Sequence, residues 1–278
     1  MISGQTALYG VLGHPVGHSL SPAMHNAAFR ELGLDAVYVP LPVAPEALLE
    51  GMRGAHALGF QGLNVTVPHK QRAAEACLRL DEVARICGAV NTLRRMGEGW
   101  EGFNTDAPAC LALIQAAGVR RGSRALLLGA GGAALAGSWA LLGAGAEVMV
   151  AARRAEAAEE LCHRMLTALA GEVVARPVEW EDAPELAERA DVVVNATSIG
   201  LGGKSDALPP FRFRPGQVTL DFVYGETAFM RLARAGGASL ITGEQVLVRQ
   251  GALAFTLWTG KAAPEALMAA ALRPRTTP

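Results

Sequence analysis

A glycine-rich turn between an apolar segment and a helical pattern constrains the fold of this chain most strongly. The turn, Gly129-Ala130-Gly131-Gly132-Ala133, directly follows residues 124–128, which have the composition of a buried strand. In that context glycines let backbone N–H groups approach a pyrophosphate at a helix N-terminus. The spacing departs from the standard Gly-x-Gly-x-x-Gly, so a tight strand-to-helix turn without a nucleotide is the competing interpretation. The turn favours a dinucleotide-binding α/β domain.

Short apolar segments alternate with helical patterns along the whole chain, which predicts an α/β fold. The expected strands are residues 7–12, 37–41, 62–67, 124–128, 147–151, 191–195 and 217–221. The expected helices are residues 21–32, 45–57, 106–117 and 245–272. Ser21 is the expected N-cap of the first helix, because Pro22 suits the first helical position.

The length of 278 residues favours two domains over one. We expect one domain at residues 1–105, with a mixed, mostly parallel sheet, and a second, Rossmann-type domain at residues 106–243. Residues 273–278 are predicted to be disordered.

Charge and composition exclude several classes of partner. The net charge is −1 and the pI about 6.6, so no overall field favours nucleic acid or an anionic membrane. The four cysteines are far apart and lack the spacing of metal ligands, so we interpret them as reduced thiols. No targeting pattern or membrane-length apolar run is present. We therefore expect a cytoplasmic protein that acts on a small molecule.

Two arginines follow the strand expected at residues 147–151. An NAD-specific fold usually ends this strand with an acid that binds the ribose 2′-hydroxyl. Here the sequence is Ala151-Ala152-Arg153-Arg154. Guanidinium groups suit a 2′-phosphate, which favours NADP, although a solvated arginine pair at a helix start is the alternative.

The segment His18-Ser19-Leu20-Ser21-Pro22 lies between a strand and a helix. Ser19 and Ser21 could there present two hydroxyls to a carboxylate at a helix N-terminus. Alternatively, Ser21 only caps the helix. His14, His18 and His25 lie nearby, but without cysteine or carboxylate neighbours they do not predict a metal site.

Lys70 and Asp106 form the candidate acid–base pair. Each follows small polar residues at the end of an apolar segment, where ligands gather in open α/β sheets. Asn91 belongs to a third such segment, and three polar edges suit a polyhydroxylated substrate. A lysine beside a carboxylate can exchange a proton with a substrate oxygen while a dinucleotide supplies hydride. The alternatives are a surface lysine and an N-cap aspartate.

Seven motifs, in this order, resemble those of the shikimate dehydrogenase family over nearly the whole chain. They are His18-Ser19-Leu20-Ser21-Pro22, Asn64-Val65-Thr66-Val67-Pro68-His69-Lys70, Gly88-Ala89-Val90-Asn91-Thr92, Gly102-Phe103-Asn104-Thr105-Asp106, Gly129-Ala130-Gly131-Gly132-Ala133, Asn195-Ala196-Thr197-Ser198 and Gln250-Gly251-Ala252. The resemblance implies reversible, NADPH-dependent reduction of 3-dehydroshikimate to shikimate, a step of chorismate and aromatic amino acid biosynthesis.

The resemblance also implies roles for individual residues. Lys70 would be the acid–base lysine, paired with Asp106. The implied substrate-binding residues are Ser19 and Ser21 for the carboxylate, Tyr224 near it, and Thr66, Asn91, Asp106 and Gln250 for the hydroxyls. The implied cofactor-binding residues are Gly129, Ala130, Gly131, Gly132, Ala133, Arg153, Arg154, Thr197, Ser198 and Gly243. Residues 1–105 would be the substrate-binding domain, with helices within 244–278 packing back on it, and residues 106–243 would be the NADP-binding domain. The two domains would close over both ligands.

The chain departs from the family pattern mainly in its cofactor half. Leu135 stands where the family usually has arginine, and Ala152-Arg153-Arg154 replaces Asn-Arg-Thr. The loop after Tyr224 is short and lacks proline, and the loop at residues 199–203 also lacks it. Three alternatives stay open: a quinate/shikimate dehydrogenase that uses NAD, an enzyme for an aminated ring, and a non-catalytic ligand-binding homologue. The chain could form a homodimer.

Overall fold

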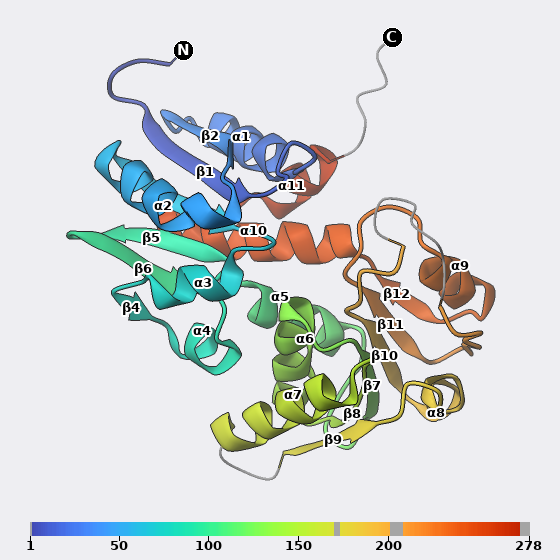
Figure 1. Cartoon of the computed structure of the whole chain (residues 1–278). Helices are drawn as coiled ribbons and strands as arrows, with labels where there is room; N and C mark the ends of the chain where they lie inside the picture. The colour runs from blue at the N-terminus through green and yellow to red at the C-terminus, as the bar shows by residue number, and fades with distance from the viewer. Residues whose placement is uncertain (1, 170–172, 201–207, 273–278) are drawn as a thin grey trace. The chain divides into compact units, whose positions relative to one another are not determined.

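The computed structural model describes residues 2–169, 173–200 and 208–272, which form two compact units (Figure 1). Unit 1 consists of Met1–Thr105 and Leu247–Pro278, and unit 2 of Asp106–Val246. The second boundary lies inside helix α10 (Gly243–Thr259). The predicted disordered segment 273–278 lies outside the described residues.

Unit 1 contains a mixed six-stranded sheet with the strand order β2-β1-β3-β5-β6-β4. The strands are β1 (Ala7–Gly13), β2 (Ala36–Pro42), β3 (Phe60–Val65), β4 (Arg79–Leu80), β5 (Thr92–Met96) and β6 (Gly99–Phe103). Strand β1 is parallel to β2 and β3, whereas β5 is antiparallel to β3 and β6. The prediction of a mixed sheet is confirmed, but strands β4, β5 and β6 were not expected.

Helices cover both faces of this sheet. The helical elements of unit 1, besides α10, are α1 (Ser21–Glu31), the 3-10 helix η1 (Pro45–Ala47), α2 (Leu48–Ala57), α3 (Lys70–Glu75), α4 (Glu82–Cys87) and α11 (Glu265–Ala270). Helices α1, α10 and α11 bury Phe29, Phe255 and Met268 against one face. Residues of α2, α3 and α4 pack with Leu63, Leu93 and Trp100 on the other.

The last helix of the sequence prediction is two helices, because the chain breaks after α10 at Gly260, which has a φ of +68°. Gly62 of β3 makes room for α10. A Cβ at Gly62 would lie 2.3 Å from the indole nitrogen of Trp258. That nitrogen donates to the backbone oxygen of Leu93 at 2.9 Å. The C-terminal helix is therefore tied directly to the sheet.

Unit 2 contains a six-stranded sheet, parallel throughout, with the strand order β12-β11-β10-β7-β8-β9. The strands are β7 (Arg124–Leu128), β8 (Glu147–Ala151), β9 (Val174–Val178), β10 (Val192–Asn195), β11 (Val218–Asp221) and β12 (Ser239–Ile241). This is the order 3-2-1-4-5-6 of a Rossmann fold, with β7 as the first strand. The predicted fold class is confirmed, although β9 and β12 were not expected.

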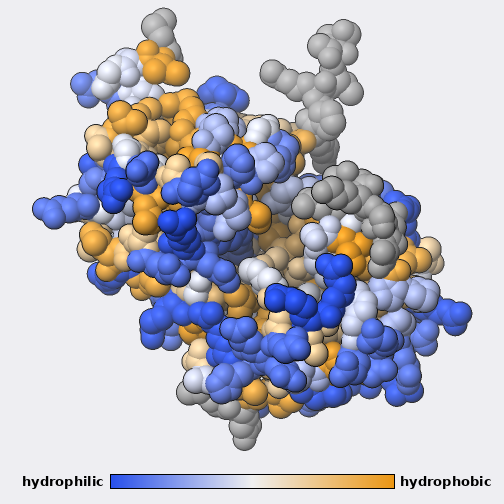
Figure 2. Space-filling view, in the orientation of Figure 1, coloured by the Kyte–Doolittle hydropathy of each residue, from blue (hydrophilic) through white to orange (hydrophobic). Residues whose placement is uncertain are grey.

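The helices of unit 2 are α5 (Asp106–Ala116), α6 (Gly132–Gly143), α7 (Ala155–Ala168), α8 (Ala183–Arg189) and α9 (Ala228–Ala235). Helices α8 and α9 bury alanines and Phe229 against one face of the sheet, with Leu126 and Leu128. Helix α7 buries Ala158, Leu161, Cys162 and Met165, and its glutamates lie outside. Figure 2 shows hydrophilic residues, in blue, over this helix.

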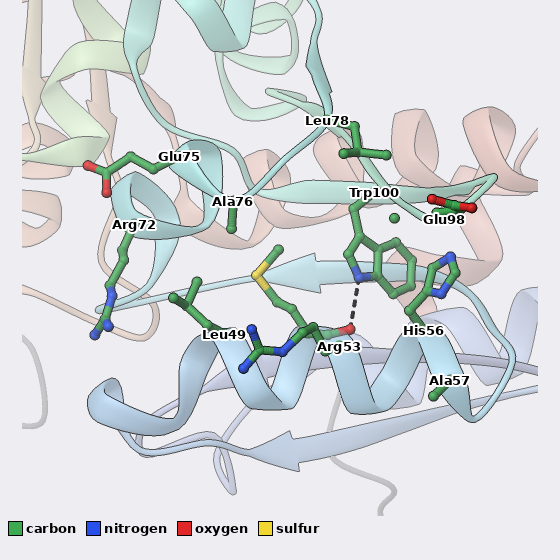
Figure 3. A pocket seen from close by; sticks show the side chains of 12 residues that line it. Leu49, Arg53, His56, Ala57, Arg72, Glu75, Ala76, Leu78, Glu98 and Trp100 are labelled. Carbon is green, nitrogen blue, oxygen red and sulfur yellow. Dashed lines mark hydrogen bonds between the residues drawn. The ribbon is translucent and has the colours of Figure 1, made fainter.

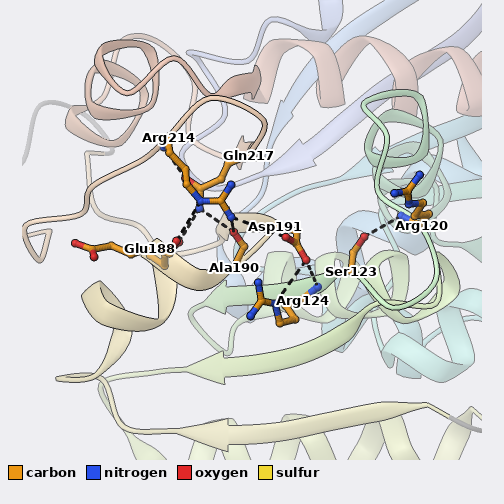
Figure 4. A network of polar contacts seen from close by, with 9 residues as sticks. Arg120, Ser123, Arg124, Glu188, Ala190, Asp191, Arg214 and Gln217 are labelled. Atoms are coloured by element: carbon orange, nitrogen blue, oxygen red, sulfur yellow. Dashed lines mark hydrogen bonds and ion pairs between the residues drawn. The ribbon is translucent and has the colours of Figure 1, made fainter.

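The amino-terminal edge of this sheet is closed by internal polar contacts (Figure 4). Asp191 accepts a hydrogen bond from the backbone nitrogen of Arg124 at 2.9 Å and forms ion pairs with the Arg124 and Arg214 side chains. The Gln217 amide donates to the backbone oxygens of Ala187 and Ala190. The polar groups at the amino-terminal edge are therefore hydrogen-bonded or ion-paired to one another. The candidate ligand-binding edge of the sheet is the carboxyl-terminal edge.

Candidate active site

The Ser19–Ser21 segment leads from β1 into α1. Ser21 is the first residue of α1 rather than its N-cap, which is Leu20, and no side chain caps the helix. The predicted N-cap is therefore wrong. Burial raises the pKa of Tyr38 well above its ordinary value, and the Ser21 side chain opposes this rise. The backbone nitrogen of Ser21 donates to Ser19 Oγ at 3.3 Å, so the two serines are joined.

A buried chain of hydrogen bonds leads from Tyr38 to Asn91. Tyr38 Oη donates to Asn64 Oδ1 at 2.7 Å. Asn64 Nδ2 donates to the backbone oxygen of Asn91 and to Thr92 Oγ1, both at 3.1 Å. All four residues are buried. The sequence analysis gave no role to Tyr38 or Thr92. The hydroxyl groups that these residues carry within strands were the only feature that could have indicated one.

The same chain continues from Asn91 to the C-terminal segment. Asn91 Nδ2 donates to Thr105 Oγ1 at 2.9 Å and to Gln250 Oε1 at 3.1 Å. The backbone nitrogen of Thr105 donates to Asn91 Oδ1 at 2.7 Å. The structure thus brings together Asn91 and Gln250, two predicted substrate-binding residues, within one network of unit 1.

Lys70 begins α3 and is half-buried. Its backbone oxygen accepts from Val90 at 2.9 Å, which fixes the segment before Asn91 beside it. Thr66 lies in the loop before Lys70. Its backbone nitrogen donates to the backbone oxygen of Leu12 of β1 at 2.9 Å. His69 is buried, and its Nε2 lies 2.7 Å from the oxygen of Val43. These contacts hold the Thr66–Lys70 loop to its neighbours.

Asp106 begins α5 in unit 2, which also carries Tyr224. Loss of solvent raises the pKa of Tyr224, and the carboxylates of Asp106 and Glu244 add to the rise, although 46% of the residue remains exposed. The negative charge of Asp106 therefore acts on Tyr224, another predicted site residue.

Gly243 starts α10 directly against the Tyr224 loop. A Cβ at this position would lie 2.7 Å from the oxygen of Val223 and 2.9 Å from Cδ1 of Tyr224. The backbone nitrogen of Gly225 donates to Glu244 Oε1 at 2.7 Å. Glycine at 243 is thus required for the close approach of the helix to this loop.

The glycine-rich turn joins β7 to α6 at the carboxyl-terminal edge of the sheet. Gly129 has a φ of +101°, and a Cβ there would lie 2.9 Å from the oxygen of Ala196 and 3.3 Å from Cγ2 of Thr197. The added Cβ at Gly131 or Gly132 would meet no atom within 4 Å, and Gly131 caps α6 without a side-chain bond. Open space in front of a helix N-terminus fits an anionic pyrophosphate.

The loops that follow β10 and β11 are tied together by a buried carboxylate. Asp221 accepts from Asn195 Nδ2 at 3.0 Å, from the backbone nitrogen of Val223 at 3.0 Å and from Thr227 Oγ1 at 2.6 Å. Burial raises the pKa of Asp221, and these hydrogen bonds oppose the rise. Asn195 Oδ1 in turn accepts from the Thr197 hydroxyl at 2.7 Å. Asp221 thus links the Thr197 loop to the loop that carries Tyr224.

Arg153 and Arg154 follow β8 and are exposed. Within the described parts of the chain, neither forms an ion pair, so both guanidiniums are available to an anion. Leu135 is buried inside α6. Ser198 is exposed next to Thr197. Of the predicted loop 199–203, residues 201–203 lie outside the described residues.

A groove of about 550 Å³ lies elsewhere in unit 1, between α2, α3 and the β4–β6 region (Figure 3). Trp100 and Met52 lie beside it, and the Trp100 indole donates to the Met52 oxygen at 2.9 Å. None of the predicted site residues lines this groove.

Among the described residues, no group of three or more His, Cys, Asp and Glu side chains is arranged to hold a metal ion. In the same part of the chain, no helix combines the length and apolar character needed to cross a bilayer.

Known proteins resemble this chain over its whole length. The model of the shikimate dehydrogenase substrate binding domain matches residues 11–93, and that of the shikimate 5′-dehydrogenase C-terminal domain matches residues 243–273. A relative from Anaeromyxobacter sp. (strain K), named shikimate dehydrogenase (NADP(+)), is 65% identical over 275 residues, which is 99% of each chain.

Solved structures are also similar. The shikimate 5-dehydrogenase of Thermus thermophilus, in complex with NADP(H) and shikimate, is 37% identical with a TM-score of 0.85, over 96% of this chain and 99% of that one. A quinate dehydrogenase from Corynebacterium glutamicum in complex with NAD is 28% identical with a TM-score of 0.86, over 96% and 98% of the two chains.

Proposed function

This chain belongs to the shikimate dehydrogenase family, and we propose that it catalyses the reversible NADPH-dependent reduction of 3-dehydroshikimate to shikimate. The observation that carries the proposal is full-length identity of 65% to a shikimate dehydrogenase (NADP(+)), in a chain whose polar network joins Asn91 and Gln250. This activity is a step of chorismate and aromatic amino acid biosynthesis.

Unit 1 is the proposed substrate domain. Ser19 and Ser21 bind the substrate carboxylate, because two hydroxyls at the start of a helix can both donate to it, and the Ser21 backbone nitrogen holds the Ser19 hydroxyl in place. Asn91 and Gln250 bind ring hydroxyls through their amides, with Thr66 as a further partner. The mutual bond between the two amides supports this role, because it holds both in fixed orientations before the ring arrives.

Lys70 and Asp106 are the proposed acid–base residues. NADPH, when bound, supplies the hydride that reduces the substrate carbonyl. Lys70 donates a proton to the oxygen on which negative charge develops, and its cationic form stabilises that charge. Asp106 is the proposed partner of the lysine in this chemistry and binds a ring hydroxyl. Tyr224, on which the charge of Asp106 acts, binds near the substrate carboxylate.

Unit 2 is the proposed NADP domain. The Gly129–Ala133 turn would receive the pyrophosphate on its open N–H groups, and Arg153 and Arg154 the 2′-phosphate. Thr197, Ser198 and Gly243 complete the proposed cofactor site. The exposed arginine pair, without an acid at the end of β8, supports NADP over NAD.

The remaining parts of the proposal concern organisation. We assign residues 1–105 with 244–278 to the substrate domain and residues 106–243 to the NADP domain, and we place the protein in the cytoplasm. A homodimer is the proposed alternative to a monomer, and light scattering of the purified protein distinguishes the two.

Initial rates with purified protein test the function. Shikimate and NADP⁺ should produce NADPH, and NAD⁺ or quinate should react far more slowly. A preference for quinate with NAD⁺ would instead favour the activity named for the Corynebacterium glutamicum structure. Calorimetric binding of shikimate without any NADP⁺ reduction would indicate a non-catalytic homologue.

A further inference from the structure

Tyr38 lies in the core beside residues of the proposed substrate site. The residue is 1% exposed, and its hydroxyl donates to Asn64 Oδ1 at 2.7 Å. The ring stacks on His25 with centroids 4.5 Å apart and planes 9° from parallel, and it also contacts Trp258. Packing on several sides leaves the phenol one position.

The direction of the hydrogen bonds around Tyr38 follows from a backbone carbonyl. The oxygen of Asn91 can only accept, so the group of Asn64 that faces it must be the donor Nδ2. Asn64 Oδ1 therefore faces Tyr38 and needs a donor, which only the phenol proton supplies. The single phenol proton is therefore committed to Asn64.

We propose that Tyr38 is a positioning residue of the substrate site, acting through Asn64 without touching the substrate. Its proton fixes Asn64, and Asn64 holds the backbone of Asn91 and the hydroxyl of Thr92. This inference rests on the proposed function, because it takes Asn91 as a substrate-binding residue.

Replacing Tyr38 by phenylalanine removes one oxygen and keeps the ring that packs on His25 and Trp258. Asn64 Oδ1 would then be buried without a donor, so Asn64 and the Asn91 segment would lose their fixed orientation. We expect Tyr38→Phe to raise the KM for shikimate about tenfold, which corresponds to about 1.4 kcal/mol. The kcat and the KM for NADP⁺ should stay within about twofold of the parent.

Tyr9→Phe is the matched control. Tyr9 is buried in the same core cluster and packs on Phe29 and Trp258, but it takes no part in the hydrogen-bonded chain that runs from Tyr38 to Gln250 among the described residues. Its KM for shikimate should remain near the parent value. An equal rise in both variants, or a rise in Tyr38→Phe that appears equally in the KM for NADP⁺, would overturn the inference.

Thr92→Val provides a second measurement that leaves the aromatic core unchanged. It removes the other side-chain partner of Asn64, so the KM for shikimate should rise with little change in kcat. Thr92 Oγ1 also donates to Asn91 Oδ1 at 3.2 Å, so its loss acts on Asn91 both directly and through Asn64. The double variant Tyr38→Phe/Thr92→Val should still raise KM by less than the product of the two single effects, because the effect of Tyr38 and part of the effect of Thr92 pass through Asn64. Full multiplication of the effects, or no rise with Thr92→Val, contradicts the role of Tyr38.

The parent protein separates this inference from the proposed function. If the parent fails to oxidise shikimate, the function is wrong, and calorimetric shikimate binding then compares the variants. If the parent is active and Tyr38→Phe retains its KM, only the positioning role fails.

Discussion

The amide nitrogen of Asn91 donates to Oε1 of Gln250 at 3.1 Å, although 159 residues separate them in the sequence. Gln250 lies on α10, which returns to unit 1 after the whole of unit 2. The C-terminal segment therefore completes the polar network of the first domain. This gives a structural reason why the family pattern extends to the end of the chain.

Lys70→Ala should lower kcat by about 10²–10⁴, the usual contribution of a general acid or base. The dissociation constant for NADP⁺ should change less than twofold, because the proposed cofactor residues are in unit 2. Steady-state rates and a fluorescence titration measure the two quantities. Lys261→Ala, at an exposed lysine of unit 1, is the control and should leave both unchanged. Turnover near the parent value in Lys70→Ala would exclude Lys70 as the acid–base residue.

Replacing either Arg153 or Arg154 by alanine should raise the KM for NADP⁺ about tenfold. The 2′-phosphate would lose one charge-assisted hydrogen bond from the missing guanidinium. The KM for NAD⁺ should not rise, since that cofactor lacks the 2′-phosphate. Initial rates with both cofactors measure the difference. Arg212→Ala, at another exposed arginine of unit 2, serves as the control. Equal rises for the two cofactors would contradict 2′-phosphate binding.

Thr227→Ala should destabilise the protein by about 2 kcal/mol, because it removes two interactions. Thr227 donates to the buried Asp221 and caps α9 by accepting from Met230 at 3.1 Å. Urea denaturation measures the free energy of unfolding. Thr242→Ala is the matched control, since its hydroxyl accepts only a 3.4 Å bond from Gln245 and should cost less. Similar losses in both variants would argue against a structural role for the Asp221 contact.

Acid should destabilise unit 1 through His25. This side chain is buried among aromatic rings, both ring nitrogens lack a hydrogen-bond partner, and burial lowers its pKa from 6.5 to about 3. The unfolded chain therefore binds a proton below about pH 6.5 while the folded chain does not, until about pH 3. Between about pH 7.5 and about pH 5 the linked loss of stability is about 2 kcal/mol.

His25→Leu should remove this part of the acid sensitivity, and denaturation at the two pH values measures it. His163→Leu, at an exposed histidine of unit 2, should lose as much stability between the two pH values as the parent does. A loss in His25→Leu as large as that of the parent would show that His25 is not the sensing group.

The fold class and the family could be predicted from the sequence, because local patterns carry them. Strands β7 and β8 are continuous apolar runs bounded by turns, and the structure has them at the predicted residues. By contrast, β5 contains two arginines and β6 two glycines, so neither has the composition of a strand. Their pairing depends on the turn at Gly97 and on the ion pair between Arg94 and Glu101.

Residues of the candidate site could be predicted from the sequence only where the residue type itself indicates ligand binding or catalysis. Lysine, aspartate and paired serines suggest ligands by their type, and the structure joins several of them. The role of Tyr38 depends on Asn64, which lies 26 residues away in the sequence, and the role of Thr227 depends on Asp221, which lies 6 residues away. Both roles also depend on which atom of each pair donates the hydrogen bond. Such information is absent from local sequence, because it arises only when strands and loops are placed side by side.

The indole of Trp258 over Gly62 also gives the protein an optical reporter of its own. The ring is tied to Leu93 and lies on the bare backbone of β3, so its emission is sensitive to whether α10 is seated on the sheet. Detachment of this helix would carry Gln250 away from Asn91 and expose the indole to water at the same time. In a variant that keeps Trp258 as its one tryptophan, with Trp100, Trp139 and Trp180 replaced by phenylalanine, a red shift in fluorescence would therefore report detachment of α10.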